Sequence, residues 1–212
     1  MSESTQAPAP AGQVYLVDND PLLRSNLGAT LGSLGYPVHS FERASDFLRI
    51  PGTAAPAVVV VDMMMPDMNG VQLQQQLRAR GLETPIIFIS GQGVCSEIIQ
   101  ALKQGAIDFL LKPVSTEALL SALQRGLMLD AERHARGQRT LEVRARFRKL
   151  TPREREVCLL MLEGHGNKEI AQLNGSAAGT VKLHRSRVLE KMGTETLSSL
   201  MRLFKDVDRS RL

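Results

Sequence analysis

A run of four valines, Val58 to Val61, ends directly in an acidic residue, Asp62, within the stretch VVVVDMMMPDMNG. Four consecutive β-branched residues predict a strand that is buried on both faces. Such strands are typical of parallel sheets, because the crossover helices cover both faces of the sheet. In open α/β folds, ligands bind at the carboxyl ends of the strands. The chain is therefore expected to contain an α/β domain with Asp62 at its ligand-binding edge.

Alternating strand and helix patterns extend over residues 13–129 and support this fold. Asp20 followed by Pro21 has the pattern of a helix cap with proline at the first helical position. Five βα units predict a doubly wound α/β fold with a five-stranded parallel sheet. The predicted strands span 13–18, 37–41, 58–62, 84–90 and 106–112, and the predicted helices span 19–35, 44–50, 71–80, 96–104 and 116–129.

The pattern changes to helices with short turns from Leu150 onward, which predicts an all-α domain of four helices. The sequence TPRE at 151–154 is a capping box, and Thr180 is expected to cap the third helix. The predicted helices start near 152, 167, 180 and 196. The expected domains are a disordered tail (1–12), the α/β domain (13–129), a charged helical linker (130–147) and the all-α domain (148–212).

Charge is distributed unevenly between the two halves of the chain. Residues 1–130 carry 8 Lys and Arg against 12 Asp and Glu, whereas residues 131–212 carry 18 against 10. A basic half beside an acidic half indicates two tasks and a polyanionic partner for the second half.

Several locations are disfavoured by composition. The sequence has no apolar run near the roughly 18 residues that a membrane span requires, and its start lacks the pattern of a secretory signal. Cys95 and Cys158 are isolated, which fits a reducing compartment. We therefore expect a cytoplasmic protein with no membrane partner.

Polar residues stand where four of the predicted strands end: Asp18, Asp62, Ser90 and Lys112. Because the carboxyl ends of parallel strands share one edge, these side chains are expected to converge. Two carboxylates suit Mg²⁺, and an ammonium with a hydroxyl suits a phosphoryl group. This set favours phosphoryl chemistry in which Asp62 is the nucleophile.

The stretches VDND, VDMMMPDMNG, IIFISGQG and GAIDFLLKP resemble the flavodoxin-like receiver domain of two-component response regulators over residues 13–129. The resemblance implies that Asp62 accepts a phosphoryl group from a cognate sensor histidine kinase. It implies Ser90 and Lys112 as phosphoryl-binding residues, Phe109 as an aromatic switch, and a cis Lys112–Pro113 bond. The implied Mg²⁺ ligands are Asp18, Asn19, Asp62 and the backbone carbonyl of Met64.

Asn19 departs from the receiver pattern, in which the second residue of the acidic pair is an acid that binds the metal. An amide oxygen can coordinate Mg²⁺ but brings no charge. We expect weaker Mg²⁺ dependence or slower phosphorylation than an Asp would give. An alternative is a degenerate receiver in a regulator that binds DNA independently of phosphorylation.

The stretches LTPREREVCLLMLEGHGNKEIA and GTVKLHRSRVLEKMG resemble the LuxR-type helix-turn-helix over residues 148–206, and together with the receiver they indicate the NarL/FixJ family, near its FixJ branch. A basic helix in a compact bundle can enter the major groove of DNA. The resemblance implies base contacts from Lys182, Leu183 and Ser186. It implies phosphate contacts from Thr180, Arg185 and Lys168, and Arg187 is a further basic residue of the same DNA-binding helix.

The helix-turn-helix also departs from its pattern. Counted from Ala171, the positions usually held by Leu and Ile are held by Asn174 and Ser176. Either the turn is shifted by one residue so that Leu173 fills the pocket, or the motif core is underpacked. The many small residues predict a mobile turn.

The resulting prediction is a non-enzymatic regulator of transcription that binds double-stranded promoter DNA. Phosphorylation is expected to favour a homodimer, with the dimer surface implied near residues 96–125, and RNA polymerase is a further expected partner. A phosphatase or phosphotransferase would need a second acid where Met64 stands. An RNA-binding antiterminator could share the receiver but would lack the TVKLHR stretch.

Overall fold

A computed structural model describes residues 12–50, 52, 56–91, 105–209 and 212 of the chain. The chain divides into two compact units, Met1–His134 and Ala135–Leu212. Each is described by itself below. Among the described residues, no helix combines the length and the apolar character that crossing a membrane requires.

The first unit is built on a five-stranded parallel sheet with the order β2-β1-β3-β4-β5, which confirms the predicted doubly wound fold. Asp62 lies opposite Ile89, and Ser90 lies opposite Leu111, so these strands end at the same edge. The strands are β1 (Gln13–Val17), β2 (Val38–Phe41), β3 (Ala57–Asp62), β4 (Ile86–Ser90) and β5 (Asp108–Leu111).

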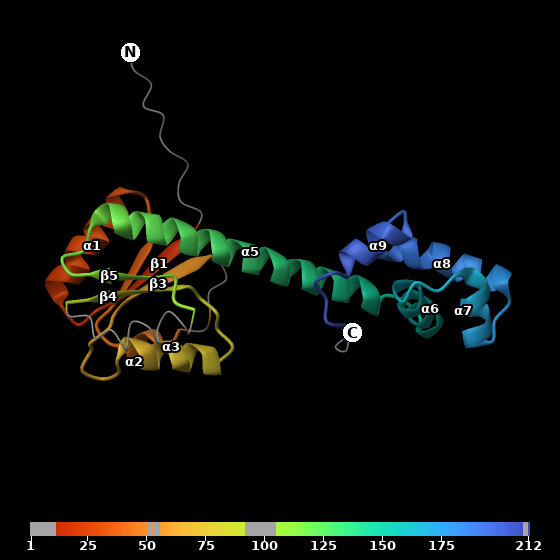
Figure 1. The fold of residues 1–212 in the computed structure, drawn as a ribbon, viewed down its shortest axis with the longest axis horizontal. Coiled ribbons are helices and arrows are strands. Elements are labelled where there is room, and N and C mark those ends of the chain that lie inside the picture. Colours follow the sequence, from red (N-terminus) through yellow and green to blue (C-terminus); the bar gives the residue numbers. More distant parts are fainter. Residues whose placement is uncertain (1–11, 51, 53–55, 92–104, 210–211) are drawn as a thin grey trace, which may run out of the picture. The chain divides into compact units, whose positions relative to one another are not determined.

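Helices cover both faces of this sheet (Figure 1). Helices α1 (Pro21–Ser33) and α5 (Thr116–Arg148) lie on one face, where Val58 and Val60 are buried against them. Helices α2 (Ala44–Phe47) and α3 (Gly70–Ala79) lie on the other face. Because all four valines are fully buried, β3 is the central strand that the sequence predicts.

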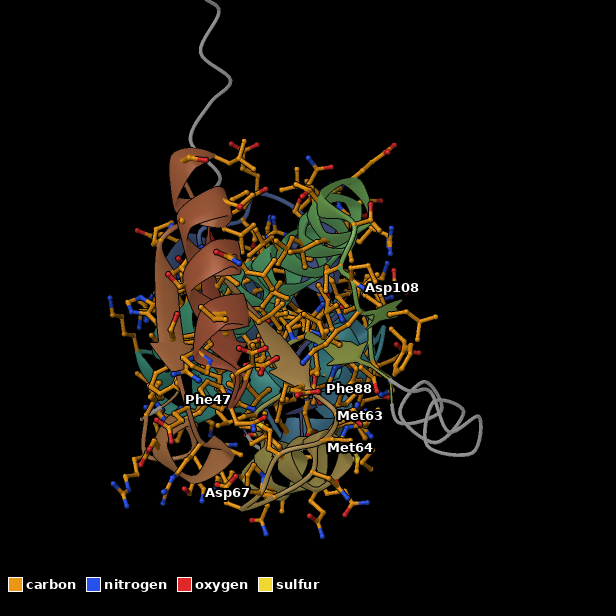
Figure 2. The ribbon with its side chains drawn as sticks, turned by 90° about the vertical axis from the view of Figure 1, so that its left-hand side faces the viewer. Phe47, Met63, Met64, Asp67, Phe88 and Asp108 are labelled. Atoms are coloured by element: carbon orange, nitrogen blue, oxygen red, sulfur yellow. The ribbon has the colours of Figure 1, made fainter. Side chains whose placement is uncertain are left out.

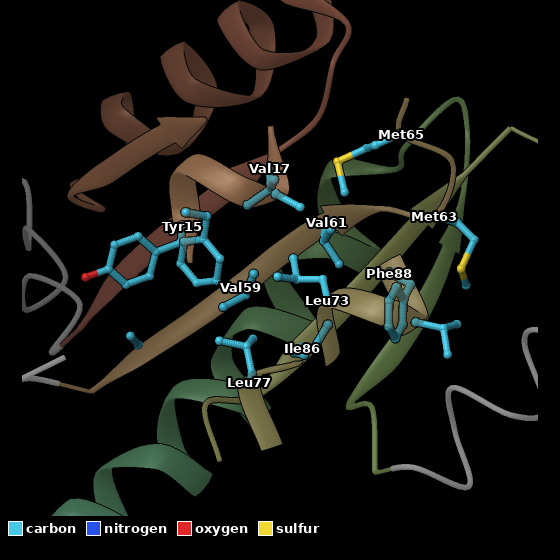
Figure 3. Packing of buried hydrophobic residues seen from close by; sticks show 14 residues of the cluster. Tyr15, Val17, Val59, Val61, Met63, Met65, Leu73, Leu77, Ile86 and Phe88 are labelled. Carbon is cyan, nitrogen blue, oxygen red and sulfur yellow. The ribbon is translucent and has the colours of Figure 1, made fainter. Parts of the chain in front are cut away.

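The core beneath α2 and α3 is formed by alternate residues of the strands (Figure 3). Val59 and Val61 of β3 pack there with Leu73 of α3 and Phe88 of β4. The alternation places every second strand residue in this core and the others beneath α1 and α5. Both layers hold β3 and therefore fix the position of Asp62 at its end.

Helix α5 differs from the prediction. The sequence predicts a helix that ends at Leu129 and then a charged helical linker. The linker is helical as predicted, but it is continuous with the preceding helix, which runs to Arg148. A single glycine, Gly137, does not interrupt it, because one glycine costs only about 1 kcal/mol in a helix interior. The predicted helix 96–104 lies outside the described residues.

The second unit is a helical bundle, and four helices follow α5 as predicted. Its core includes Val143 and Phe147 from the last part of α5, with the ring of Phe147 6.1 Å from that of Phe204. The helices are α6 (Pro152–Leu162), α7 (Asn167–Asn174), α8 (Ala178–Met192) and α9 (Leu197–Leu203).

The helix ends test the predicted caps. Asp20 caps α1, and Thr151 forms the predicted capping box with Glu154 at the start of α6. The prediction that Thr180 caps the third helix of this bundle is wrong, because α8 begins at Ala178 after an Ala177 cap. Gly175 adopts a left-handed conformation (φ +67°) that ends α7. The next helix, α8, then begins two residues before the expected start at Thr180.

Candidate functional site

The carboxyl edge of the sheet brings Asp18, Asp62 and Lys112 into one hydrogen-bonded group. The Lys112 Nζ donates to Oδ2 of Asp18 at 2.9 Å and to Oδ2 of Asp62 at 3.0 Å. Asp18 follows β1, Asp62 ends β3 and Lys112 follows β5, so three strands supply one site. The two residues are buried, Asp18 at 0% exposure and Asp62 at 7%. A shared ammonium lets the two acids lie close together without unbalanced repulsion.

The Lys112 ammonium is held in its charged form. Partial burial lowers the pKa of Lys112, but the hydrogen bonds and the negative charges of Asp18 and Asp62 outweigh it and raise the pKa above its ordinary value. A permanent positive charge beside two carboxylates can stabilise negative charge that develops on a transferred group.

Ser90 and Phe109 lie on the neighbouring strands. Ser90 is buried at the end of β4, and its carbonyl accepts a hydrogen bond from the Lys112 backbone N–H at 2.8 Å. Phe109 is half-buried in β5 and packs against the core beneath α2 and α3. The Lys112–Pro113 peptide bond is cis, as predicted.

The loop after β3 presents Met64 at the site. Met63 and Met65 are buried, whereas Met64 is 65% exposed. Figure 2 shows Met63, Met64 and Asp67 in this loop. The loop ends at Gly70, where there is no room for a side chain. A Cβ there would lie 2.8 Å from the Phe88 ring and 3.0 Å from the Asp62 carbonyl. The glycine of the sequence motif is thus required by a close approach of α3 to the strand that ends in Asp62.

The remaining residues of the acidic VDND stretch have different positions. The Asn19 side chain is exposed, and the Asp20 carboxylate accepts hydrogen bonds from the Leu22 and Leu23 N–H groups at the start of α1. No cluster of three or more His, Cys, Asp or Glu side chains occurs within the described ranges. The site therefore offers two carboxylates, Asp18 and Asp62, as charged oxygen ligands.

These donors fit Mg²⁺. The ion takes one or two carboxylates and completes its shell with other oxygens and water. Asp18 and Asp62 supply the carboxylates, and the Asn19 amide oxygen and Met64 carbonyl belong to the segments that follow them directly. The donor set is entirely oxygen, which is the chemistry of a hard divalent cation.

Arg24 belongs to this edge and was missed by the sequence analysis. Its Nη1 donates to the Asp18 backbone carbonyl at 2.5 Å. The available signal was weak: Arg24 stands four residues after Asp20, in the first part of the helix that Asp20 caps.

A second candidate site lies on α8, where most of the predicted DNA-binding residues share an exposed face. Four of them are exposed and lie one, three or four positions apart, which places them on one side of the helix: Lys182, Leu183, Ser186 and Arg187. Thr180, one turn before Leu183, is exposed as well, and so is Lys168 on α7. On the opposite side, Val181 and Val188 are fully buried in the bundle core.

Three basic side chains hold α8 in the bundle. Arg185, predicted to contact phosphate, is half-buried and donates to the His165 carbonyl at 3.1 Å. Lys191 donates to Oε2 of the buried Glu154 at 2.6 Å. Arg146 of α5 donates to the Met192 carbonyl at the end of α8 at 2.9 Å. These contacts fix the middle and the carboxyl end of α8 and orient its exposed face.

The turn before α8 decides between the two alternatives for the motif core. Leu173 is 60% exposed, so the alternative in which it fills the pocket is wrong. Asn174 instead turns inward, and its Nδ2 is buried without a hydrogen-bond partner in the described part of the chain. A buried donor without an acceptor is unfavourable, which agrees with the alternative of an imperfectly packed core.

Two family models match the chain. The model described as the response regulator receiver domain matches residues 14–124, and the one described as bacterial regulatory proteins of the luxR family matches residues 148–204. The response regulator protein TodT of Pseudomonas putida is 34% identical over 193 residues, covering 91% of this chain and 85% of TodT. The transcriptional regulatory protein FixJ of Bradyrhizobium diazoefficiens is 33% identical over 194 residues, covering 91% and 94%.

A solved structure shares the same architecture. The low-resolution structure of the response regulator StyR aligns with a TM-score of 0.81 and 38% sequence identity, covering 92% of this chain and 98% of the StyR chain. The order of the two matched models along the chain agrees with the two units, a parallel-sheet unit followed by a helical one.

Proposed function

The chain belongs to the NarL/FixJ family of two-component response regulators, which regulate transcription, and from this we propose that Asp62 accepts a phosphoryl group from a sensor histidine kinase. The observation that carries the proposal is the Lys112 ammonium, which donates to both Asp18 and Asp62 at the edge of the sheet. The receiver domain implies the kinase partner, and the LuxR-type domain implies DNA.

The chemistry that we propose follows from these groups. The Asp62 carboxylate attacks the phosphorus of phosphohistidine, and the bond from phosphorus to the kinase nitrogen breaks as the bond to the Asp62 oxygen forms. Lys112 neutralises charge on the phosphoryl oxygens, and the Ser90 hydroxyl at the end of β4 hydrogen-bonds to one of them. Phe109, one strand away and half-buried, is proposed to change its packing in response.

Mg²⁺ is the proposed cofactor of this step, held by Asp18, Asp62, the Asn19 amide oxygen and the Met64 carbonyl. When bound, it would neutralise charge on the phosphoryl oxygens during transfer. Only Asp18 and Asp62 bring negative charge, because the side chain at position 19 is an amide.

The proposed output is binding to double-stranded promoter DNA by the exposed face of α8. Lys182, Leu183 and Ser186 would face bases, whereas Thr180, Arg185, Arg187 and Lys168 would meet phosphates. A phosphorylation-dependent dimer would place two α8 helices on a two-fold DNA site and recruit RNA polymerase. The proposed dimer surface includes Leu111, which is 59% exposed on β5. The proposed location for this task is the cytoplasm.

The experiment is intact-mass analysis and size determination after incubation with acetyl phosphate and Mg²⁺. The wild type should gain one phosphoryl group and shift from monomer to dimer, and Asp62→Asn should do neither. Absence of the phosphoryl group on a folded wild-type chain would contradict the proposal. DNA binding is tested in parallel on duplex DNA and structured RNA at several salt concentrations, with duplex DNA expected to bind more tightly.

A second candidate is a regulator that works without phosphorylation, and the neutral, exposed Asn19 favours it. Under this alternative, Asp62→Asn and the wild type would bind promoter DNA equally, with or without acetyl phosphate. An enzymatic role has less support, because the apolar Met64 is exposed where an acid or amide would be needed to orient water.

A further inference from the structure

Arg24 places a positive charge at the candidate phosphoacceptor site, and helix stability does not explain it. Arg24 is the fourth residue of α1, whose first turn has no acidic residue. The amino end of a helix carries partial positive charge, so a cation there is unfavourable. Arg24 also has no ion pair with any residue that the structure describes, and its Nη1 donates a 2.5 Å hydrogen bond to the Asp18 carbonyl.

The contact places two cations around Asp18. Lys112 binds the Asp18 carboxylate at 2.9 Å, and Arg24 binds its backbone carbonyl. Asn19, the next residue, contributes no charge. Among the groups in direct contact, the Asp18 and Asp62 carboxylates are matched by two cations, so their formal charges balance without a metal ion. The Asp20 carboxylate accepts from the Leu22 and Leu23 N–H groups instead. A balanced site attracts a divalent cation less strongly than a site with net negative charge.

We propose that Arg24 sets the ionic preference of the phosphoacceptor site: its guanidinium weakens Mg²⁺ binding and strengthens binding of the phosphoryl group. The inference rests on the proposed function in its use of Asp62 as acceptor. The guanidinium repels the metal through space and attracts the phosphoryl oxygens, so its two effects have opposite signs. Asn19 acts in the same direction by omitting a negative charge.

The opposite changes expected in Mg²⁺ affinity and phosphoryl affinity distinguish this role from a structural one. If Arg24 only held the Asp18 backbone in place, its removal would disorder the site and weaken both Mg²⁺ and phosphoryl binding. If it acts by its charge, Arg24→Gln tightens Mg²⁺ binding and weakens phosphoryl binding, while Arg24→Lys keeps both near the wild type. The charge effect also decreases with added salt, because exposed charges are screened.

The test is an NMR titration of the full-length protein, in which Mg²⁺ affinity is read from the amide signals of residues 18–20 and 62–64. Beryllofluoride at saturating Mg²⁺ serves as the phosphoryl probe. For Arg24→Gln we expect Mg²⁺ affinity to rise about threefold or more, and beryllofluoride affinity to fall by a similar factor. Arg78→Gln, the same change in the last turn of a different helix, α3, should alter either affinity by less than about 1.5-fold.

Unchanged or weaker Mg²⁺ binding by a folded Arg24→Gln protein would overturn the inference. If Arg24→Gln does not fold, Arg24→Lys and Asn19→Asp keep it testable: Asn19→Asp should tighten Mg²⁺, and Arg24→Lys should not. The Mg²⁺ titration does not require phosphotransfer. A site that binds Mg²⁺ as expected but gains no phosphoryl group from acetyl phosphate would contradict the proposed function and leave the role of Arg24 in metal binding intact.

Discussion

Outside the candidate phosphoacceptor site, a buried carboxylate joins distant segments in each unit, and the two carboxylates differ in their partners. In the first unit, Asp130 of α5 is 4% exposed and accepts a hydrogen bond from the Ala57 N–H at 2.8 Å. In the second unit, Glu154 of α6 is 2% exposed and accepts from the Thr151 N–H at 2.8 Å and from Lys191 Nζ at 2.6 Å. Asp130 thus binds the start of β3, and Glu154 binds the last turn of α8.

The partners give the two carboxyl groups opposite pKa directions. Burial raises the pKa of Asp130, and the Ala57 hydrogen bond with the nearby His134 and Arg133 does not offset it. Burial also raises the pKa of Glu154, but the hydrogen bonds from Lys191 and Thr151 outweigh it and lower the pKa. Burial alone therefore does not decide whether the charged form of a carboxyl group is favoured; a cation that hydrogen-bonds directly to it, as Lys191 does to Glu154, shifts the balance.

The largest expected effect comes from removing the acid that has the charged partner. Glu154→Ala removes the capping-box acceptor and leaves Lys191 without its partner, so the free energy of unfolding of the helical unit should fall by about 2–3 kcal/mol. The value is at the low end for a buried pair, because the Lys191 side chain is 36% exposed and can be hydrated. Hydrogen exchange of α6 and α8 peptides measures the change.

The control is Glu156→Ala, two residues later on the same helix. Glu156 pairs with Arg153 at 2.9 Å on the surface, and such pairs contribute about 0–1 kcal/mol. An equal loss of stability in both variants would contradict the expectation that the buried pair contributes more than the surface pair.

The next effect tests whether Asp130 acts as a hydrogen-bond acceptor or as a charge. Asp130→Ala leaves the Ala57 N–H without an acceptor and should cost about 1–2 kcal/mol. Asp130→Asn keeps an acceptor oxygen and removes the buried charge, so its change should stay within about 0.5 kcal/mol or stabilise the unit. Urea unfolding followed by far-UV circular dichroism, with exchange of β3 peptides, compares them. An equal loss in both variants would show that the charge itself is required.

Asp130 and Glu154 also illustrate which features the sequence could predict and which it could not. The β3 strand, the Asp20 and Thr151 caps and the polar strand ends were predictable because their patterns are local. Asp130 was read as the start of a linker, since its partner is 73 residues away in sequence. Glu154 was predicted in the capping box, but its bond to Lys191 spans 37 residues and has no local pattern.

The same reasoning applies to the helix-turn-helix and to the acidic site. The hydrophobic pattern alone left two alternatives open: a shifted turn with Leu173 in the pocket, or an underpacked core at Asn174. Where α7 ends decides between them, and that depends on the left-handed Gly175. Arg24 binds a backbone carbonyl. Every residue has such a carbonyl, so no residue type in the sequence indicates this contact.

A smaller effect is expected at the buried Nδ2 of Asn174, which has no hydrogen-bond partner among the described residues. Asn174→Leu removes the unpaired Nδ2 and adds apolar volume, so the helical unit should gain about 1 kcal/mol. The Asn174 Oδ1 accepts from the Ser176 N–H, but that N–H also donates to the Ala171 carbonyl at 3.1 Å and stays satisfied. Thermal unfolding measures the gain.

Asn167→Leu is the matched control, because Asn167 is exposed at the start of α7. It should change stability by less than about 0.5 kcal/mol. Destabilisation by Asn174→Leu would mean that the asparagine is accommodated by packing that a leucine cannot reproduce.

The smallest effect is the response to pH, because only charge changes and no hydrogen-bonding atom is removed. Asp130 has a raised pKa, so its contribution to stability is fully present below its ordinary value of 3.8 and is lost as the pH rises through the folded-state pKa. Glu154 has a lowered pKa, so its contribution is present above its ordinary value of 4.5 and is lost as the pH falls through the folded-state pKa. On acidification from pH 6, the Asp130 contribution should therefore increase while that of Glu154 decreases below pH 4.5. Urea unfolding at each pH isolates them as differences between the wild type and Asp130→Asn or Glu154→Gln. The two difference curves should slope in opposite directions, and parallel slopes would contradict the assignment of opposite pKa directions to the two buried acids.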